Sequence, residues 1–262
     1  MTTGPRGGRI DVHAYIGAYP FRQVPHPEPE VLARVLEREG ASGAWVGSLP
    51  AAWHRDPAPA NEELVARLAP HPTLRPAPVV RPDWPRWERT LREAVDRGAP
   101  AVKAYPTHWG MGPGDARMDA LANACGEAGV ALLLTVRFED LRQRHVIDVA
   151  GDLSAAAIRA VARAGTRCRI VVLAAGRATI EEVHWALTPD EQSRLWWDIS
   201  WIWGPPEDDL AHLLRTLGGA RLLYGTGWPL RLTQASRANL ALLPDDLATV
   251  SLASADAVIA GR

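Results

Sequence analysis

Eight short apolar segments alternate along the chain with segments of helical period, and this alternation constrains the fold more than any other feature. Several of the eight are apolar almost throughout, as parallel strands are when both faces are covered. The pattern predicts an α/β protein with a parallel sheet wound with helices. The expected strands are Arg9–Ile16, Gly43–Ser48, Leu74–Val80, Ala101–Tyr105, Val130–Arg137, Arg169–Ala174, Leu195–Ile202 and Arg221–Gly225.

The segments between these strands carry residues that commonly begin and end helices. Asp83 is expected to cap a helix that buries Trp87 and that ends at Gly98. Asp152 and Gly165 are expected to bracket another helix in the same way. These helices would serve as the crossovers that parallel strands require.

The length of the chain agrees with one eight-fold barrel. It has 262 residues, close to the roughly 250 of a plain barrel of this kind. No linker, repeat or low-complexity stretch divides it. We therefore expect one (β/α)8 TIM barrel domain over residues 1–262. The structural alternative is a flavodoxin-like open sheet, but that fold normally uses about five strands, and no glycine-rich phosphate loop follows the first expected strand.

Composition limits the partners and the location of the protein. The net charge is −1, so no basic field indicates a nucleic-acid partner or a membrane surface. The longest apolar run, 130–136, is far too short to cross a bilayer. Residues 1–9 lack the apolar stretch of a signal peptide. We expect a cytoplasmic protein with a small-molecule substrate, and we leave a homo-oligomer open.

Several strand segments match the motifs of a known family in order and spacing. Ile10–Tyr15 resembles an opening Asp-x-His-x-His strand, and Ala101–Pro106 resembles a Gly-Val-Lys-Leu-x-Pro strand. Arg221–Pro229 resembles a closing Arg-Leu-Leu-Phe-Gly-Ser-Asp-x-Pro strand. Over nearly its whole length the chain therefore resembles the amidohydrolase-related barrels of the amidohydrolase 2 type, which include metal-dependent decarboxylases and hydrolases. The resemblance implies the same (β/α)8 fold.

The resemblance also implies a metal site, but this sequence departs from it. Only His13 matches a metal-binding residue of the family. The positions that match the other four family ligands hold Tyr15, Thr135, Ala174 and Gly227. A catalytic zinc needs about three protein ligands. We therefore expect no metal and no other cofactor; a rearranged metal site that recruits Asp11 or His108 is the alternative.

Side chains at the carboxyl ends of the strands are the candidates for chemistry. Residues two apart on a strand share a face, and the family register turns Asp11, His13, Tyr15, Lys103, Tyr105, Thr135 and Arg137 into the barrel. We predict His13, Tyr15, Lys103 and Asp11 as catalytic residues. The other interpretation is that Asp11 and Lys103 form a buried ion pair that only neutralises both charges.

The substrate-binding residues are predicted from charge and aromatic character. Arg137 has no obvious partner at its own strand end, and a free guanidinium there favours a carboxylate or phosphate ligand. Five of the 11 tryptophans fall at or just beyond strand ends and suggest a pocket for an aromatic, polycyclic or cationic group, unless they simply roof the barrel; the six others, Trp185 among them, are assigned to packing. The predicted binding residues are Tyr105, His108, Trp109, Arg137, Trp201 and Trp228, with His108 as a second acid–base candidate.

These residues favour a small-molecule enzyme that works by metal-independent acid–base chemistry. His13 would carry the proton, Tyr15 or Tyr105 would donate one, and Lys103 and Arg137 would hold an anionic centre. Cyclisation, isomerisation, elimination, decarboxylation and hydrolysis all suit this set, and Lys103 could instead form a Schiff base. The first alternative is a catalytically inactive binding protein, and the second is a metal-dependent hydrolase or decarboxylase with a rearranged site.

Overall fold

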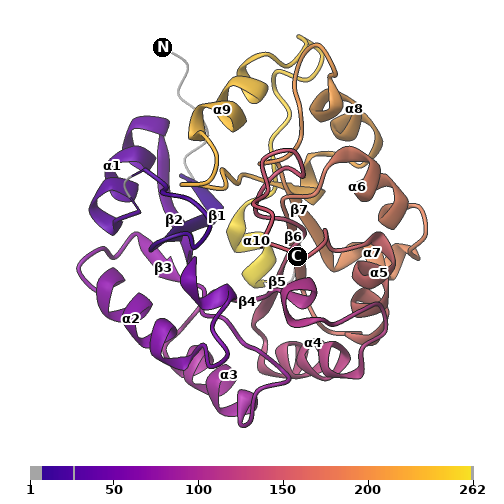
Figure 1. The fold of residues 1–262 in the computed structure, drawn as a ribbon. Coiled ribbons are helices and arrows are strands. Elements are labelled where there is room, and N and C mark those ends of the chain that lie inside the picture. Colours follow the sequence, from indigo (N-terminus) through magenta and orange to yellow (C-terminus); the bar gives the residue numbers. More distant parts are fainter. Residues whose placement is uncertain (1–7, 26, 261–262) are drawn as a thin grey trace.

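Eight parallel strands form an inner ring, and helices surround it, as the view along the barrel in Figure 1 shows. The computed structural model describes residues 8–25 and 27–260. Each expected strand is present, although most are shorter than the sequence suggests. The strands are β1 (Arg9–Ile16), β2 (Ala41–Ser48), β3 (Leu74–Pro76), β4 (Ala101–Ala104), β5 (Ala131–Thr135), β6 (Ile170–Leu173), β7 (Leu195–Asp198) and β8 (Leu222–Leu223).

Backbone hydrogen bonds close these strands into a barrel. Regular pairing gives two parallel sheets, β1-β2-β3 and β4-β5-β6-β7-β8. At one seam the Lys103 amide donates to the Pro78 carbonyl (2.8 Å), and at the other the Tyr15 amide donates to the Trp228 carbonyl (2.8 Å). Isolated bridges lie at both seams, so the ring is complete. The predicted (β/α)8 fold is confirmed.

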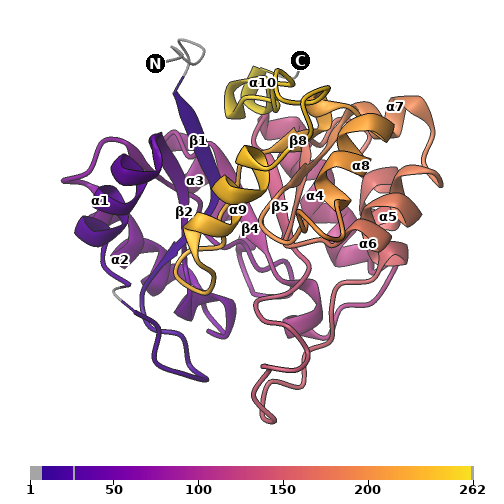
Figure 2. The same cartoon turned by 90° about the horizontal axis from the view of Figure 1, so that it is seen from above.

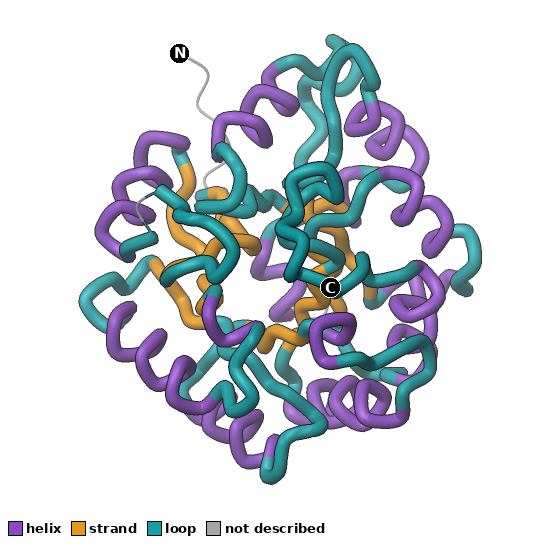
Figure 3. Tube along the Cα trace, viewed as in Figure 1, coloured by secondary structure: helices purple, strands orange, loops and turns teal. Residues whose placement is uncertain are grey.

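The helices form the outer layer, which Figure 3 shows in purple around the orange strands. They are α1 (Pro29–Glu39), α2 (Ala58–Leu68), α3 (Trp87–Asp96), α4 (Ala116–Ala128), α5 (Ala155–Ala164), α6 (Arg177–His184), α7 (Pro189–Ser193), α8 (Asp209–Thr216), α9 (Thr233–Ala241) and α10 (Ala255–Ala260), with 3-10 turns η1 (Pro50–Ala52), η2 (Pro106–Trp109) and η3 (Gly219–Arg221). No helix in residues 8–25 and 27–260 has the length and apolar character that crossing a membrane would require.

Two of the predicted helix starts are wrong. Arg86, in a left-handed conformation, occupies the N-cap position of α3, while Asp83 accepts hydrogen bonds from the Arg81 guanidinium. Ser154 caps α5, while Asp152 pairs with two arginines. In both places a nearby guanidinium gives the carboxylate a charge-assisted partner, so the carboxylate is satisfied without capping the helix. Gly98 and Gly165 do follow their helices.

Strand β3 is shorter than predicted because prolines and a side chain interrupt its ladder. Proline has no amide to donate, and Pro76 and Pro78 both lie in the expected strand. At Val79 the side chain of Asn61, on α2, replaces the hydrogen bonds of a neighbouring strand. It donates to the Val79 carbonyl (2.8 Å) and accepts from the Val79 amide (2.9 Å). The buried backbone groups of Val79 are thereby satisfied without a neighbouring strand.

The two ends of the barrel differ in character. At the amino end of the strands an apolar cluster that includes Trp45, Leu133 and Trp196 fills the interior, and α10 closes it with Ala255 and Val258. Figure 2 shows α10 on one side of the barrel and the long loops after β1 and β5 on the opposite side. Trp185, assigned to packing from the sequence, is instead 64% exposed. The loop side is where the strands carry polar side chains.

Candidate active site

A layer of buried polar side chains crosses the barrel at the carboxyl ends of the strands. Each member is at most 3% exposed. All four predicted catalytic residues lie in it. Three further members are Asp198, whose direction the sequence left undecided, and Ser200 and Thr226, which the sequence did not single out. The members are Asp11, His13, Tyr15, Lys103, Tyr105, Thr135, Asp198, Ser200 and Thr226.

His13 is the centre of a chain of hydrogen bonds within this layer. Its Nδ1 lies 2.8 Å from Asp198 Oδ2 and 3.1 Å from Ser200 Oγ. Because an ionised carboxylate only accepts, we assign the Nδ1 proton to the bond with Asp198. The other nitrogen, Nε2, then accepts from the Tyr15 hydroxyl at 3.1 Å. Asp198 thus fixes the orientation of the imidazole and directs its basic nitrogen at Tyr15.

Asp198 is held in its charged form by its surroundings. Burial alone would raise its pKa, but His13, Ser200 and the Ala174 amide together lower the pKa below the usual value. The Ala174 amide donates to Asp198 Oδ1 at 2.7 Å. Ala174 has a φ of 59°, which is a left-handed conformation for a residue other than glycine. Such strain clusters at functional sites, and here it aims a donor at the carboxylate.

Lys103 is the only lysine of the sequence, and it is fully buried. Gly47 leaves room for its stem, since a Cβ at that position would lie 2.7 Å from Lys103 Cε. The Nζ lies 4.1 Å from the centre of the Tyr15 ring and has no hydrogen-bond partner among the described residues. Burial lowers the pKa of Lys103 to about 7, although Asp198 and Asp11 favour its charged form.

The ion pair between Asp11 and Lys103, which is the alternative interpretation of these two residues, does not form among the described contacts. The pairing of β1 with β2 shifts register between Asp11 and Ala14, and a bulge of this kind breaks the alternation of side chains. Val12 therefore joins the apolar interior. The Asp11 carboxylate accepts from the Thr226 hydroxyl (2.5 Å) and from the His13 amide (2.9 Å). Asp11 fastens β1 to the loop after β8 and so positions His13.

Aromatic side chains from three loops cover the polar layer. We call Tyr19, Phe21, Trp53 and Phe138 the aromatic roof. Phe138 is its centre, with its ring 4.8 Å from that of Trp53, 5.2 Å from that of Tyr105 and 5.8 Å from that of Tyr15. The roof is fastened by Glu139, which accepts from Arg22 (2.5 Å) and from the Tyr19 hydroxyl (3.2 Å).

His108 and Trp109 lie against this roof rather than beside His13. The ring of His108 is 5.2 Å from that of Phe138, and burial lowers the pKa of His108 to about 4. Its Nε2 is 3.7 Å from Asp148. The Trp109 indole donates to the Ala52 carbonyl at 3.2 Å. These two residues have structural contacts here, which the sequence did not anticipate.

A narrow crevice leads from the outside to His13. It is lined by His13, Arg137, Phe138, Trp201, Gly227, Leu230 and Arg231, and it is too tight to admit a water molecule. Of the predicted binding residues, Arg137 and Trp201 therefore border the crevice, while Tyr105 belongs to the polar layer and Trp228 is buried outside the crevice.

The expectation that Arg137 lacks a partner is wrong. Its Nη2 lies 2.8 Å from Asp152, and its guanidinium lies 5.1 Å from the centre of the Trp201 ring. Asp152 also pairs with Arg144 at 2.5 Å. The partner comes from the end of the long loop after β5, where strand alternation predicts nothing.

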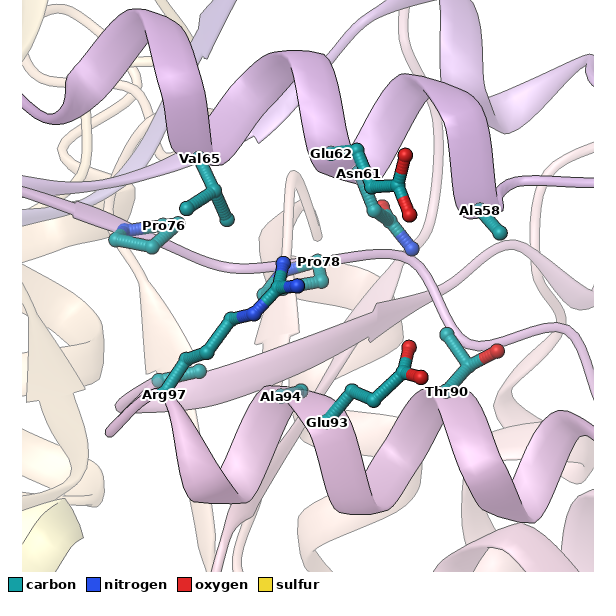
Figure 4. A pocket seen from close by; sticks show the side chains of 11 residues that line it. Ala58, Asn61, Glu62, Val65, Pro76, Pro78, Thr90, Glu93, Ala94 and Arg97 are labelled. Atoms are coloured by element: carbon teal, nitrogen blue, oxygen red, sulfur yellow. The ribbon is translucent and has the colours of Figure 1, made fainter.

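A second hollow, shown in Figure 4, lies between α2 and α3 on the outside of the barrel. Asn61 borders it, but the Asn61 amide is already bonded to Val79. Glu62, Glu93 and Arg97 come from the helix surfaces and do not meet in the picture. This hollow offers no grouping of acid, base and nucleophile, so we place the candidate site at the barrel mouth.

The residues at the mouth do not fit a metal ion. In the described part of the chain no three His, Cys, Asp or Glu side chains gather in a way that could hold one. His13 directs one nitrogen at Asp198 and the other at a phenol, and both Asp198 oxygens accept hydrogen bonds. Ala174 and Gly227 offer no side-chain donor, and a zinc site needs about three protein ligands.

Comparisons with known proteins identify the fold. No family model matches the chain, and no curated protein matches it. Solved structures do match. A dihydroxybenzoic acid decarboxylase from a Polaromonas species, with bound manganese and the inhibitor 2-nitroresorcinol, is 13% identical, with 97% of each chain covered and a TM-score of 0.68. A Pseudomonas putida protein described as a candidate 2-pyrone-4,6-dicarboxylic acid hydrolase is 19% identical, with 97% of each chain covered and a TM-score of 0.64.

A third structure, an amidohydrolase from Mycobacterium avium subspecies paratuberculosis, is 17% identical over 88% of this chain and 74% of its own, with a TM-score of 0.62. The protein is thus a (β/α)8 barrel with a buried histidine–aspartate pair at the carboxyl end of its strands. More narrowly, it has the barrel fold of the amidohydrolase-type structures. The resemblance drawn from the strand motifs is confirmed at the level of the fold.

Proposed function

We propose that the protein is an amidohydrolase-like enzyme that carries out acid–base chemistry on a small molecule without a metal ion. The observation that carries this proposal is the buried chain from Asp198 through His13 to Tyr15, with bonds of 2.8 and 3.1 Å. A carboxylate that orients an imidazole and stabilises its charged form is a recurrent arrangement for proton transfer. Its place at the carboxyl ends of the strands is where enzymes of this fold work.

In the proposed chemistry, protons pass between the substrate and the two linked side chains of His13 and Tyr15. Burial raises the pKa of Tyr15, so its hydroxyl stays protonated and can act as the donor. His13 Nε2 can accept a proton as the substrate releases one, and Asp198 then stabilises the imidazolium. Lys103 supplies a positive charge in a water-excluded site, where it can stabilise a developing anion.

We propose a planar acid with an aromatic or similarly flat body as the substrate. Trp201 and Phe138 flank the crevice with aromatic faces, and Arg137 and Arg231 border it with positive charge. Two proteins of the same fold are named after planar acids of this kind, dihydroxybenzoic acid and 2-pyrone-4,6-dicarboxylic acid. Decarboxylation and hydrolysis are therefore the reactions to test first among those that the residues allow.

The protein purified without chelator is expected to contain well under one zinc, iron or manganese ion per chain. The physical reason is the donor set, in which Tyr15, Thr135, Ala174 and Gly227 stand where the resemblance implies ligands. Elemental analysis of the purified protein measures this. One tightly held transition metal ion per chain, whose removal abolished activity, would contradict the metal-independent proposal.

The activity itself is tested by screening planar aromatic acids and lactones with metal-stripped protein. NMR in D2O follows both product formation and deuterium incorporation, which reports proton transfer to carbon. We expect turnover by the parent protein and a strongly reduced rate in a His13→Ala variant. Turnover that appeared only after a metal ion was added would reject the proposal in favour of a rearranged metal site.

The second candidate function is a non-catalytic binding protein. The tightness of the crevice favours it, because a substrate reaches His13 for proton transfer only if residues that line the crevice move apart. The buried charges of Lys103 and Asp198 argue the other way, since burying charge is costly for a site without use. Ligands that bind without any proton exchange or turnover would favour this second function.

A further inference from the structure

Arg231 lies where the crevice above His13 meets the solvent-filled outer groove. We call this place the doorway. Arg231 follows β8 in a tight turn, with its amide donating to the Gly227 carbonyl at 3.1 Å. It borders both the crevice above His13 and an open outer groove of about 540 Å³, solvent at its mouth included. Arg231 is therefore one of the residues at which the groove and the crevice meet.

The Arg231 side chain is held in place by aromatic faces rather than by a carboxylate. Its guanidinium lies 4.3 Å from the centre of the Trp201 ring and 5.3 Å from that of Trp203. No carboxylate of the described residues lies within ion-pair distance, and its Nε is buried without a hydrogen-bond partner. Burial lowers the pKa of Arg231, yet an arginine keeps its charge at working pH.

The other charged groups at the doorway are already compensated. Asp152 pairs with Arg137, Arg22 pairs with Glu139, and Arg142 pairs with Asp140 at 2.8 Å. Glu139 and Asp140 both border the outer groove. With these pairs in place, Arg231 is the arginine of the doorway whose charge and donors are left over for a ligand.

Arg231 also occupies the place that Gly227 leaves open. Gly227 has a φ of 71°, and a Cβ built on it would lie 3.4 Å from Arg231 Cδ. The strand motif that Gly227 belongs to resembles one in which an aspartate stands at this position. The positive charge of Arg231 therefore lies beside Gly227, the position at which the family motif carries the negative charge of an aspartate.

We propose that Arg231 is the specificity-determining residue that binds the carboxylate of the substrate, with the flat body of the substrate lying against Trp201. A guanidinium offers two parallel donors that match the two oxygens of a carboxylate, and the contact with Trp201 limits where that fork can lie. The inference rests on the proposed function, because it assigns a residue to the planar acid proposed there.

The inference is tested by binding, without turnover. The probes are 4-fluorobenzoate and its neutral counterpart 4-fluorobenzamide, titrated by ¹⁹F NMR. The parent protein is expected to bind the acid at least roughly tenfold more tightly than the amide, and Arg231→Gln is expected to remove most of that difference. Arg231→Lys keeps the charge but loses the fork, so we expect an intermediate affinity.

Arg137→Gln serves as the matched control at the same doorway. Asp152 keeps its second partner Arg144 in that variant, so we expect a smaller loss of acid binding than in Arg231→Gln. Binding of the probe does not require proton transfer, so it can be measured whether or not the protein turns over any substrate. A failure of the inference is therefore distinguishable from a failure of the proposed chemistry.

Several results would overturn the inference. They are equal acid binding by the parent and both Arg231 variants, equal binding of acid and amide by the parent, and no binding of the acid up to its solubility limit. Displacement of the acid by inorganic phosphate at similar concentrations would overturn it as well, since a site shaped for a planar carboxylate should discriminate against a tetrahedral anion.

Discussion

The His13→Ala variant is expected to lower the turnover rate by about 10²–10⁴-fold, which is the usual contribution of a positioned acid–base group. The imidazole joins Asp198 to Tyr15, with bonds of 2.8 and 3.1 Å, and no other side chain of the described residues is hydrogen-bonded to both. Removing it breaks the only described path for a proton between them. Steady-state kinetics on the first substrate identified by the NMR screen measures the effect.

Two further variants separate a catalytic role of His13 from a structural one. His13→Asn can keep a hydrogen bond to Asp198 but cannot accept and release a proton near neutral pH. Asp198→Asn keeps the shape of the carboxylate but favours the wrong imidazole tautomer, so a large fall in turnover with nearly unchanged folding is expected. A folded His13→Asn variant that turned over at nearly the parent rate would leave His13 a structural residue and would direct attention to Lys103.

The fold could be predicted because a barrel buries its strands on both faces. That burial forces runs such as Leu132–Leu134 and Ile170–Leu173 to be apolar throughout, so they are visible in the sequence. The strand ends were less predictable, because hydrogen bonds decide them and those depend on neighbours far away in the chain. The Asn61 side chain that replaces a strand at Val79 is such a neighbour.

The candidate site was predictable only where side chains alternate regularly. On β4 and β5 the alternation correctly placed Lys103, Tyr105 and Thr135 in the buried layer. On β1 the bulge turned Asp11 away from Lys103, and a bulge has no clear mark in this sequence. On β7 the residues 195–197 are all apolar, so no alternation revealed which way Asp198 faces.

The loop residues of the site gave no periodic signal at all. Phe138 borders the crevice, Asp152 neutralises Arg137, and Arg231 lies against Trp201 at the doorway. Arg137 and Asp152 lie at the two ends of one loop after β5, whereas Phe138 and Arg231 contact residues of loops that follow other strands. Such contacts are set by the closed barrel, which brings the ends of β5, β7 and β8 to one rim. Sequence spacing predicts the rim but not which loop residues meet on it.

The Lys103→Met variant is expected to be more stable than the parent protein below pH 7, and its advantage is expected to shrink as the pH rises towards 10. The pKa of Lys103 falls from about 10.4 in an unfolded chain to about 7 in the folded protein. Between these values the unfolded state binds the proton more tightly, so the stability of the parent rises with pH across this window. Methionine has a similar length and no charge, so it removes this penalty.

The expected gain is at most roughly 5 kcal/mol, at about 1.4 kcal/mol for each unit of the pKa difference. The pKa of about 7 already includes the attraction of Lys103 to Asp198 and Asp11, which favours its charged form. Urea unfolding of parent and variant at pH 6, 8 and 10 gives the difference in unfolding free energy at each pH. The same variant is expected to lose turnover, since stability gained in an active site commonly comes with lost activity.

The single lysine of the sequence makes the underlying pKa directly measurable. Protein labelled with ¹³C-lysine gives NMR signals from Lys103 alone, and their pH titration is expected to have its midpoint near 7. A midpoint above about 10, together with a stability difference that does not change between pH 6 and 10, would show that Lys103 is well solvated. The positive charge would then be too screened to stabilise an anion in the barrel, and the acid–base proposal would rest on Asp198, His13 and Tyr15 alone.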